Sequence, residues 1–317
     1  MSQPMPKTAE ILQLCPLLPA LEAALAERFT VHRHFEAGTQ GRLDALAPAI
    51  RGVVTGGHIG ISPDLAARLP ALEIVAINGV GFDKVDLAEA KRRGIRVSNT
   101  PDVLTEDVAD LAIGLIVALL RQIVRGDGHV RAGAWPKGDL GLASKVSRKR
   151  VGILGLGRIG LAIARRLEGF DAAISYHNRN PRDDVPYAYV ADPRALAAGC
   201  DILVVAAAAS AQTRDIVDSA VLKALGPRGF LVNVARGSVV DEPALLAALE
   251  AGEIAGAGLD VFADEPNVPA GFLGLPNVVL TPHMASATHE TRQAMADLVL
   301  ANLDAHFAGR DLPTALV

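Results

Sequence analysis

Short apolar runs alternate along most of the chain with stretches in which apolar positions repeat at helical spacing. Before residue 100 the runs predict strands at 11–15, 52–55, 73–77 and 95–98, and the stretches between them predict helices at 19–29, 63–69 and 85–93. After residue 150 they predict six more strands, at 151–154, 173–176, 202–206, 230–234, 258–261 and 278–281. This alternation is typical of α/β proteins, and the six later strands predict a doubly wound parallel sheet.

A proline and the last helix indicate two domains. Pro101 disfavours helical backbone at Thr100, so we place the first boundary there. The helix predicted at 289–307 follows the later strands and is expected to pack back on the N-terminal region. The predicted domains are therefore residues 100–287 and a discontinuous domain made of residues 1–99 and 288–317.

The helix predicted at 105–121 is apolar nearly all round, with Glu106 and Asp107 in its first turn, where acidic groups suit the helix dipole. Such a helix is expected to be buried, between domains or between subunits. Its apolar run, residues 111–120, is too short to span a bilayer.

The segment 151–160 (VGILGLGRIG) contains three glycines at the spacing of a dinucleotide-binding turn, with an apolar strand before it and a helical pattern after it. Gly155 permits the tight turn, Gly157 lets backbone approach a pyrophosphate, and Gly160 lets the helix pack on the strand. The phosphates would then meet the N–H groups at the start of the helix. A lone motif of this kind is weak, but the strand and helix around this one predict a dinucleotide site.

Composition and charge exclude several other classes. The chain has 317 residues, half of them hydrophobic, and a net charge of −4, which gives no support for a nucleic-acid partner. Cys15 and Cys200 lack CxxC or metal-ligand spacing, so they predict buried thiols in a reducing compartment and no metal site. Residues 1–10 contain no signal-peptide core. We therefore expect a cytoplasmic protein with no membrane partner.

Three polar residues follow strands of the later sheet: Arg236, Glu265 and His283. Each has an ordinary alternative, because Arg236 could be a solvated charge, Glu265 a turn residue and His283 a satisfied loop histidine. All three, however, follow strands of one parallel sheet, at the edge where a dinucleotide must lie. They are therefore the candidate catalytic residues.

Several segments between residues 78 and 288 together resemble the D-isomer-specific 2-hydroxyacid dehydrogenase family. They are residues 78–86 (NGVGFDKVD), the glycine turn, 233–237 (NVARG), 265–266 (EP) and 281–283 (TPH). Residues 135–139 (WPKGD) and 152–160 are most similar to glyoxylate/hydroxypyruvate reductases, including hydroxyphenylpyruvate reductases. The resemblance implies a Rossmann-type dinucleotide-binding domain at 100–287. It also implies a flavodoxin-like substrate-binding domain at 1–99 and 288–317, with the active site in the cleft between the two.

The resemblance implies a role for each candidate residue in reducing a 2-oxoacid by hydride transfer. His283 would give a proton to the ketone oxygen, and Glu265 would hold the imidazole and favour its charged form. Arg236 would bind the substrate carboxylate and ketone oxygen, while the N–H groups of Val80 and Gly81 would receive the carboxylate.

The expected cofactor contacts lie on the glycine turn, at two strand ends and at the start of the apolar helix. They are Thr105, Gly155, Gly157, Arg158, Ile159, Gly160, Asn178, Arg179, Asn180, Val234 and Asp260. Asp260 would face the nicotinamide carboxamide; its alternative is that of a helix or turn cap.

The strand at 173–176 ends without the acid that binds the ribose 2′-OH in NAD-specific folds. His177 is followed instead by Asn178, Arg179 and Asn180, which can pair with a 2′-phosphate. We therefore expect NADP(H) to be preferred, with NAD(H) possible. The alternative is that Arg179 is a solvated loop charge and that both cofactors are used.

The sequence leaves the physiological 2-oxoacid open among glyoxylate, hydroxypyruvate, 2-ketogluconate and arylpyruvates. A formate-dehydrogenase-like activity is disfavoured because that subgroup has glutamine at the position of Glu265. A dinucleotide-sensing binding protein on the same fold ranks low, because no added peptide-docking segment is recognisable. The resemblance also implies a homodimer in which Trp135 reaches toward the partner's active site, or else Trp135 is an ordinary aromatic.

Overall fold

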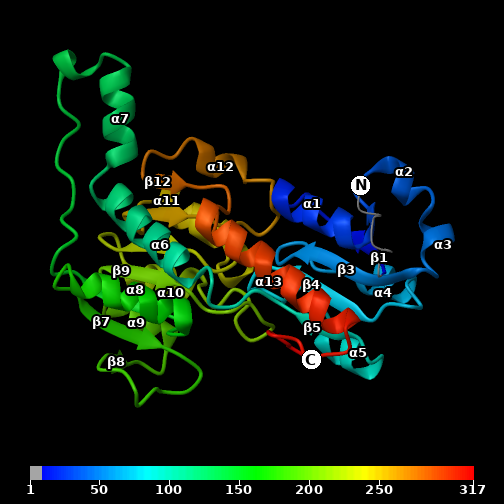
Figure 1. Cartoon of the computed structure of the whole chain (residues 1–317). Helices are drawn as coiled ribbons and strands as arrows, with labels where there is room; N and C mark the ends of the chain where they lie inside the picture. Colours follow the sequence, from blue (N-terminus) through cyan, green and yellow to red (C-terminus); the bar gives the residue numbers. More distant parts are fainter. Residues whose placement is uncertain (1–8) are drawn as a thin grey trace. The chain divides into compact units, whose positions relative to one another are not determined.

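The computed structural model describes residues 9–317 and divides into two compact units (Figure 1). One, here called the discontinuous unit, consists of Met1–Leu104 and Ala287–Val317. The other, the continuous unit, is Thr105–Ser286. The divisions fall within a few residues of the boundaries predicted at 100 and 288.

The discontinuous unit contains a five-stranded parallel sheet in the order β2-β1-β3-β4-β5. Its strands are β1 (Glu10–Gln13), β2 (Thr30–Arg33), β3 (Ile50–Gly56), β4 (Ile74–Asn78) and β5 (Arg96–Ser98). The order is that of flavodoxin-like folds, which confirms the predicted class of this unit. Only β2 was missed, because it is an edge strand whose four residues are all half-buried and carry no apolar run.

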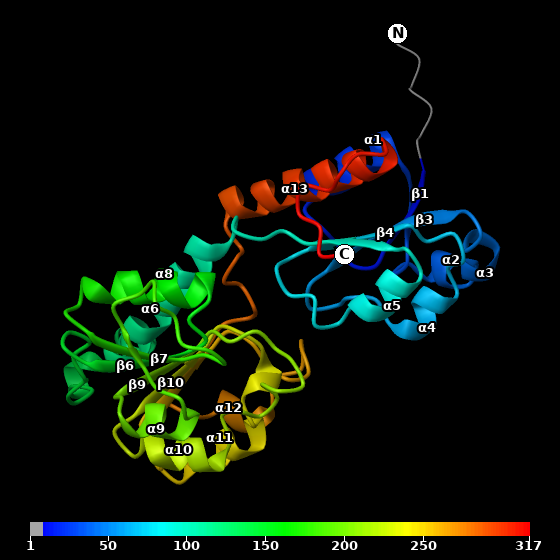
Figure 2. The same cartoon turned by 90° about the horizontal axis from the view of Figure 1, so that it is seen from below.

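Helices cover both faces of this sheet (Figure 2). They are α1 (Pro19–Arg28), α2 (Ala37–Gln40), α3 (Leu43–Leu46), α4 (Pro63–Ala67), α5 (Leu87–Arg92) and α13 (His289–Phe307). Successive side chains of a strand point to opposite faces, so Ile11 packs under α1 and α13 while Leu12 packs with Leu43 on the other side. The last helix therefore packs on the N-terminal strands, as predicted.

The continuous unit contains a seven-stranded parallel sheet in the order β12-β11-β10-β9-β6-β7-β8. Its strands are β6 (Arg150–Leu154), β7 (Ala173–His177), β8 (Ala188–Tyr189), β9 (Ile202–Val205), β10 (Phe230–Asn233), β11 (Gly256–Leu259) and β12 (Val278–Leu280). Counted from β6, the order is the 3-2-1-4-5-6 of the Rossmann fold with one further strand at the edge, which confirms the predicted class. The prediction of six strands missed β8, which has only two residues.

Strand β11 begins two residues before its predicted start, so it contains Gly256 as well as Gly258. The glycines allow close packing: a Cβ on Gly258 would lie 3.3 Å from the Leu115 Cβ, and one on Gly256 would lie 2.4 Å from the Asn277 carbonyl oxygen. A side chain at either position would disturb the packing.

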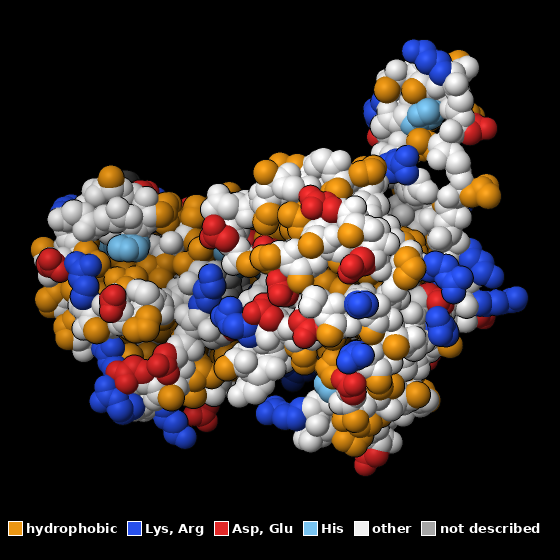
Figure 3. Space-filling model, turned by 180° about the vertical axis from the view of Figure 1, so that it is seen from behind, with side chains coloured by type: hydrophobic (Ala, Val, Ile, Leu, Met, Phe, Trp, Pro, Cys, Tyr) orange, Lys and Arg blue, Asp and Glu red, His pale blue; other side chains and the backbone are white. Residues whose placement is uncertain are grey.

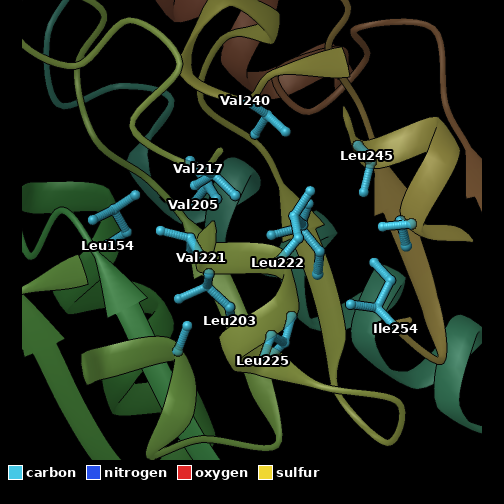
Figure 4. Close-up of a cluster of buried hydrophobic side chains, with 14 of the residues drawn as sticks. Leu154, Leu203, Val205, Val217, Val221, Leu222, Leu225, Val240, Leu245 and Ile254 are labelled. Atoms are coloured by element: carbon cyan, nitrogen blue, oxygen red, sulfur yellow. The ribbon is translucent and has the colours of Figure 1, made fainter. Parts of the chain in front are cut away.

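The helical elements of the continuous unit are α6 (Thr105–Leu120), α7 (Ile123–Arg131), η1 (Trp135–Lys137), α8 (Arg158–Glu168), α9 (Pro193–Ala198), α10 (Ser219–Leu225), η2 (Gly237–Val239), α11 (Glu242–Glu250) and α12 (Ala270–Leu273). Leu203, Val205, Leu222 and Ile254 belong to a core cluster on one face of the sheet (Figure 4). Among the described residues, no helix combines the length and apolarity needed to cross a membrane.

Within one chain, helix α6 is buried along one face, and burial of its other side by a partner subunit stays a prediction. Leu115, Ile116 and Leu119 are buried, whereas Leu111 and Val117 are only half-buried. The chain then continues into α7, which was not predicted, and this segment projects from the sheet of its own unit (Figure 1).

Candidate active site

In the glycine turn after β6, packing requires glycine at two of the three positions. Gly155 has φ +97°, and a Cβ there would lie 2.5 Å from the nitrogen of Ala207. A Cβ on Gly160 would lie 2.1 Å from the Gly155 carbonyl oxygen, so α8 starts hard against the turn. A Cβ on Gly157 would have no atom within 4 Å. Packing thus explains Gly155 and Gly160, while the backbone at Gly157 is left open.

The open backbone at Gly157 suits a dinucleotide phosphate. Gly157 is the N-cap of α8, and no side-chain cap hydrogen bond is made there. Arg158 and Ile159 form the first helical positions. Because unsatisfied N–H groups and the helix dipole both favour an anion at a helix start, the residues present fit a pyrophosphate group.

The end of β7 is less constrained. Asn178 Oδ1 accepts the N–H of Leu156 at 2.7 Å, so this side chain helps hold the glycine turn. Arg182, which sequence reasoning did not select, also holds the turn by donating from Nη1 to the Leu156 carbonyl at 2.9 Å. Arg179 and Asn180 are exposed. The only signal for Arg182 was its short distance in sequence from Asp184, with which it pairs.

His283 lies in the loop after β12 and is paired with Glu265. Its Nδ1 and the Glu265 Oε2 are 2.7 Å apart, and the other Glu265 oxygen accepts the N–H of Phe262 at 3.0 Å. His283 has φ +49°, which is unusual for a residue other than glycine, and its N–H donates to the Asp260 carbonyl at 2.8 Å. A strained position held by such bonds is typical of a functional residue.

Asp260 organises the loop that carries His283. Its carboxylate is buried and accepts hydrogen bonds from the Thr281 hydroxyl at 2.6 Å, the Met284 N–H at 2.9 Å and the Ala285 N–H at 3.1 Å. Burial raises the pKa of the Asp260 carboxyl, while these hydrogen bonds act in the opposite direction. Its contacts are those of a turn cap, which was the alternative to a cofactor contact.

Arg236 lies in the loop after β10, against the turn that carries Glu265. A Cβ on Gly237 would lie 2.0 Å from the Phe262 carbonyl carbon, so only glycine permits this approach. Asn233, which was not selected as a site residue, shapes the loop: its Oδ1 accepts the Ala235 N–H at 3.0 Å and its Nδ2 donates to the Arg236 carbonyl at 3.1 Å. The carboxyl ends of three neighbouring strands thus bring these loops together.

Two further predicted cofactor contacts of the continuous unit, Val234 and Thr105, lie at the end of a strand and at the start of a helix. Val234 is buried, and its N–H donates to the Val205 carbonyl at 3.2 Å. Thr105 is the first residue of α6 and is half-buried. Among residues 9–317 there is no cluster of three or more His, Cys, Asp or Glu side chains suited to a metal ion.

The discontinuous unit presents a second glycine turn at the end of β4. The Thr100 N–H donates to the Gly79 carbonyl at 2.9 Å, and the Asn99 amide donates to the Val80 carbonyl at 2.9 Å. A Cβ on Gly57 would lie 2.9 Å from the Gly81 carbonyl oxygen, so the glycine turn after β3 packs directly against this one. Asn99, which sequence reasoning missed, therefore helps fix the backbone of Val80 and Gly81.

Comparisons with known proteins agree with this geometry. Residues 113–285 match the model of the D-isomer specific 2-hydroxyacid dehydrogenase, NAD binding domain. The chain is 51% identical to hydroxyphenylpyruvate reductase of Plectranthus scutellarioides and 46% identical to 2-ketogluconate reductase of Gluconobacter oxydans, each over 97% of this chain and 98% of the relative.

A solved structure extends the likeness to the fold. It is the NADPH-dependent glyoxylate/hydroxypyruvate reductase from Sinorhizobium meliloti in complex with NADP and malonate, with a TM-score of 0.93 and 44% identity. The match covers 98% of this chain and 97% of that one. With the family model covering more than half of the chain, these findings show that the protein is an oxidoreductase of the D-isomer-specific 2-hydroxyacid dehydrogenase family.

Proposed function

We propose that the protein reduces a small 2-oxoacid of the glyoxylate/hydroxypyruvate type to the D-2-hydroxyacid, with NADPH as the preferred reductant. The observation that carries the proposal is the 2.7 Å pair between His283 and Glu265. The pair lies beside the Arg236 loop, on the same sheet as β6, the strand that ends in the open glycine turn. An acid/base, a fixed cation and a phosphate cradle on one sheet suit a reduction by hydride transfer.

His283 supplies the proton in this proposal. A carboxylate only accepts hydrogen bonds, so Glu265 places the imidazole proton on Nδ1 and directs proton exchange to Nε2. The bound nicotinamide would supply hydride to the carbonyl carbon. In reduction, Nε2 of the imidazolium gives its proton to the ketone oxygen, and in oxidation the neutral ring takes it back.

Substrate recognition is assigned to Arg236 and to the second glycine turn. The guanidinium stays charged and its planar fork matches the carboxylate and ketone oxygens of a 2-oxoacid. The N–H groups of Val80 and Gly81 receive the carboxylate, on backbone that Asn99 holds in place.

The cofactor would be held by the glycine turn, the start of α8 and the end of β7. Gly155, Gly157, Arg158, Ile159 and Gly160 would receive the pyrophosphate. Thr105, Val234 and Asp260 complete the predicted set. The preference for NADP(H) is supported by the exposed Arg179 and Asn180 at the end of β7 and by the NADP bound to the similar reductase of Sinorhizobium meliloti.

A second substrate class is favoured by the relatives. The names of two relatives that each cover 97% of the chain support hydroxyphenylpyruvate and 2-ketogluconate as alternatives to glyoxylate and hydroxypyruvate. All four share the carboxylate and ketone that Arg236 and the Val80–Gly81 turn would bind. A binding protein that only senses the dinucleotide is the remaining class, and it would not oxidise NADPH.

The homodimer is supported by apolar side chains on and beyond α7. Ile123, Val124, Val130 and Trp135 are exposed, and Leu142 is fully exposed. Hydrophobic side chains are visible among basic ones on this segment, at the upper right of Figure 3. A cluster of this kind is typical of an interaction surface. We expect a symmetric dimer by light scattering, and a mass near the 33.0 kDa of one chain would contradict it.

A cytoplasmic location is supported by the two cysteines. Both are free and buried, as predicted, and burial raises the pKa of Cys200 to about 12. Thiols kept in this way suit a reducing compartment.

The direct test of the proposed function is a steady-state screen of the four acids with NADPH and NADH. We expect NADPH absorbance to fall with at least one acid and kcat/KM to be higher with NADPH than with NADH. Absence of turnover with all four acids would overturn the assignment. Equal or better kcat/KM with NADH would overturn the cofactor preference alone.

A further inference from the structure

Glu242, which has no role in the proposal above, contacts the turn that carries Glu265. It is the first residue of α11, whose N-cap Asp241 accepts the Ala244 N–H at 3.0 Å. Its own Oε1 accepts the N–H of Ala263 at 2.7 Å. Glu242 therefore ties the start of a helix to a turn 21 residues further along the chain.

Two carboxylates bind consecutive N–H groups of this turn. Glu265 accepts from Phe262 at 3.0 Å, and Glu242 accepts from Ala263 at 2.7 Å. Glu265 uses its other oxygen for His283. The two carboxylates are close enough to interact: burial raises the pKa of Glu242, and the charges of Glu265 and Asp264 raise it further, against the hydrogen bond from Ala263.

We propose that Glu242 is a positioning residue for the proton-transfer pair: its hydrogen bond holds the Phe262–Glu265 turn, and its negative charge favours the protonated form of His283. The inference rests on the proposed function, in which His283 is the residue that donates the proton. In this role Glu242 acts through the turn and through His283, without contacting substrate or cofactor.

Of the charged residues around His283 and Glu265, Glu242 is the most suitable for substitution. Asp264 lies in the turn itself, Asp260 holds the His283 loop, and Arg236 lies against the turn through Gly237. Asp260 and Arg236 have other roles that their replacement would disturb. Glu242 acts from a separate helix, so its charge can be removed without touching the loop of His283.

Two substitutions separate the hydrogen bond from the charge. Glu242→Gln keeps an oxygen for the Ala263 N–H but removes the charge, whereas Glu242→Ala removes both. Glu250→Gln removes a charge at the exposed far end of the same helix and serves as the matched control. The variants are compared in NADPH-dependent reduction of hydroxypyruvate across pH, together with thermal unfolding.

Glu242→Gln should move the alkaline limb of the reduction profile to lower pH, by about 0.5 pH unit for a partly solvated neighbouring charge, with little change in the plateau rate. Glu242→Ala should show the same movement and also a several-fold fall in kcat, because the turn is no longer held. Glu250→Gln should match the wild type. Profiles of both Glu242 variants that superimpose on the wild type would overturn the inference.

A second measurement does not depend on turnover. The imidazole signal of His283, assigned by its loss in His283→Ala, is titrated by NMR in the wild type and in Glu242→Gln. A lower midpoint in the variant supports the inference, and an identical midpoint overturns it. Lack of 2-oxoacid reduction by the wild type would instead overturn the proposed function, so the two failures are distinguishable.

Discussion

The His283 loop and the end of β7 both follow strands of the same sheet, but they are held very differently. Around His283, Asp260 accepts three hydrogen bonds from the loop and Glu265 fixes the ring. At the end of β7, Arg179 and Asn180 are exposed. On the proposed function, we therefore expect proton transfer to depend on a preorganised loop and cofactor choice to depend on a few side chains at the surface.

The largest expected effect comes from removing the proton donor. His283→Ala should lower kcat by about 10²- to 10⁴-fold, the range for loss of a general acid, with cofactor binding nearly intact. Stopped-flow turnover and NADPH fluorescence measure the two quantities. His32→Ala is the matched control, because His32 forms a similar 2.7 Å pair with Glu10 on the other sheet. An unchanged kcat in His283→Ala would end the assignment.

Loosening the loop that carries His283 should lower kcat less than removing His283 itself. In Asp260→Asn the amide nitrogen replaces an oxygen that now accepts a hydrogen bond, so a buried loop N–H loses its acceptor. We expect a loss of about 1–3 kcal/mol in the free energy of unfolding and a fall in kcat of about ten- to a hundredfold. Denaturant unfolding and steady-state kinetics test both. Wild-type values for both would show that the loop does not need this cap.

Glu265→Gln should change the pH profile as well as the rate. Without the carboxylate the imidazolium is less favoured, so the alkaline limb for reduction should move to lower pH by about one pH unit. The Phe262 N–H keeps its acceptor in this variant, so the fold should be retained. An unmoved limb would indicate that Glu265 orients the ring without acting through its charge.

The smallest effect is expected at the exposed end of β7. Arg179→Ala should raise KM for NADPH several-fold and hardly alter KM for NADH, because only NADPH carries the 2′-phosphate. Arg182→Ala gives the contrast. Arg182 donates to the Leu156 carbonyl in the glycine turn, so its removal should weaken the binding of NADPH and NADH alike. Equal effects of Arg179→Ala on both cofactors would contradict the selective role.

The sequence predicted the elements whose cause is local. The glycines at 155 and 160 and most buried strands follow from turn geometry and apolar runs, and the structure confirms them. It gave the cap contacts of Asp260 only as an alternative to a cofactor contact. It did not predict the contacts of Glu242 and Asn99, because each binds a backbone group 19 or more residues away. Such contacts depend on how neighbouring strands bring their loops together.

At the end of β7, too, a contact between distant residues was not predicted from the sequence. Asn178 was expected at the 2′-phosphate, and its carboxamide oxygen accepts from Leu156 in the glycine turn. The role of Asn178 toward the cofactor stays a prediction. Strand β8 was missed because two residues are too few to show an apolar period. Helix α7 was missed because its sequence is rich in glycine and charge and shows no clear apolar period.

The pH dependence of kcat/KM in both directions tests the central claim most directly. If His283 exchanges the proton, 2-oxoacid reduction should fall and 2-hydroxyacid oxidation should rise with increasing pH over the same range, because one direction needs the imidazolium and the other the neutral ring. Both limbs should vanish in the residual activity of His283→Ala. Limbs that persist in that variant, or that run the same way in both directions, would contradict the assignment of His283.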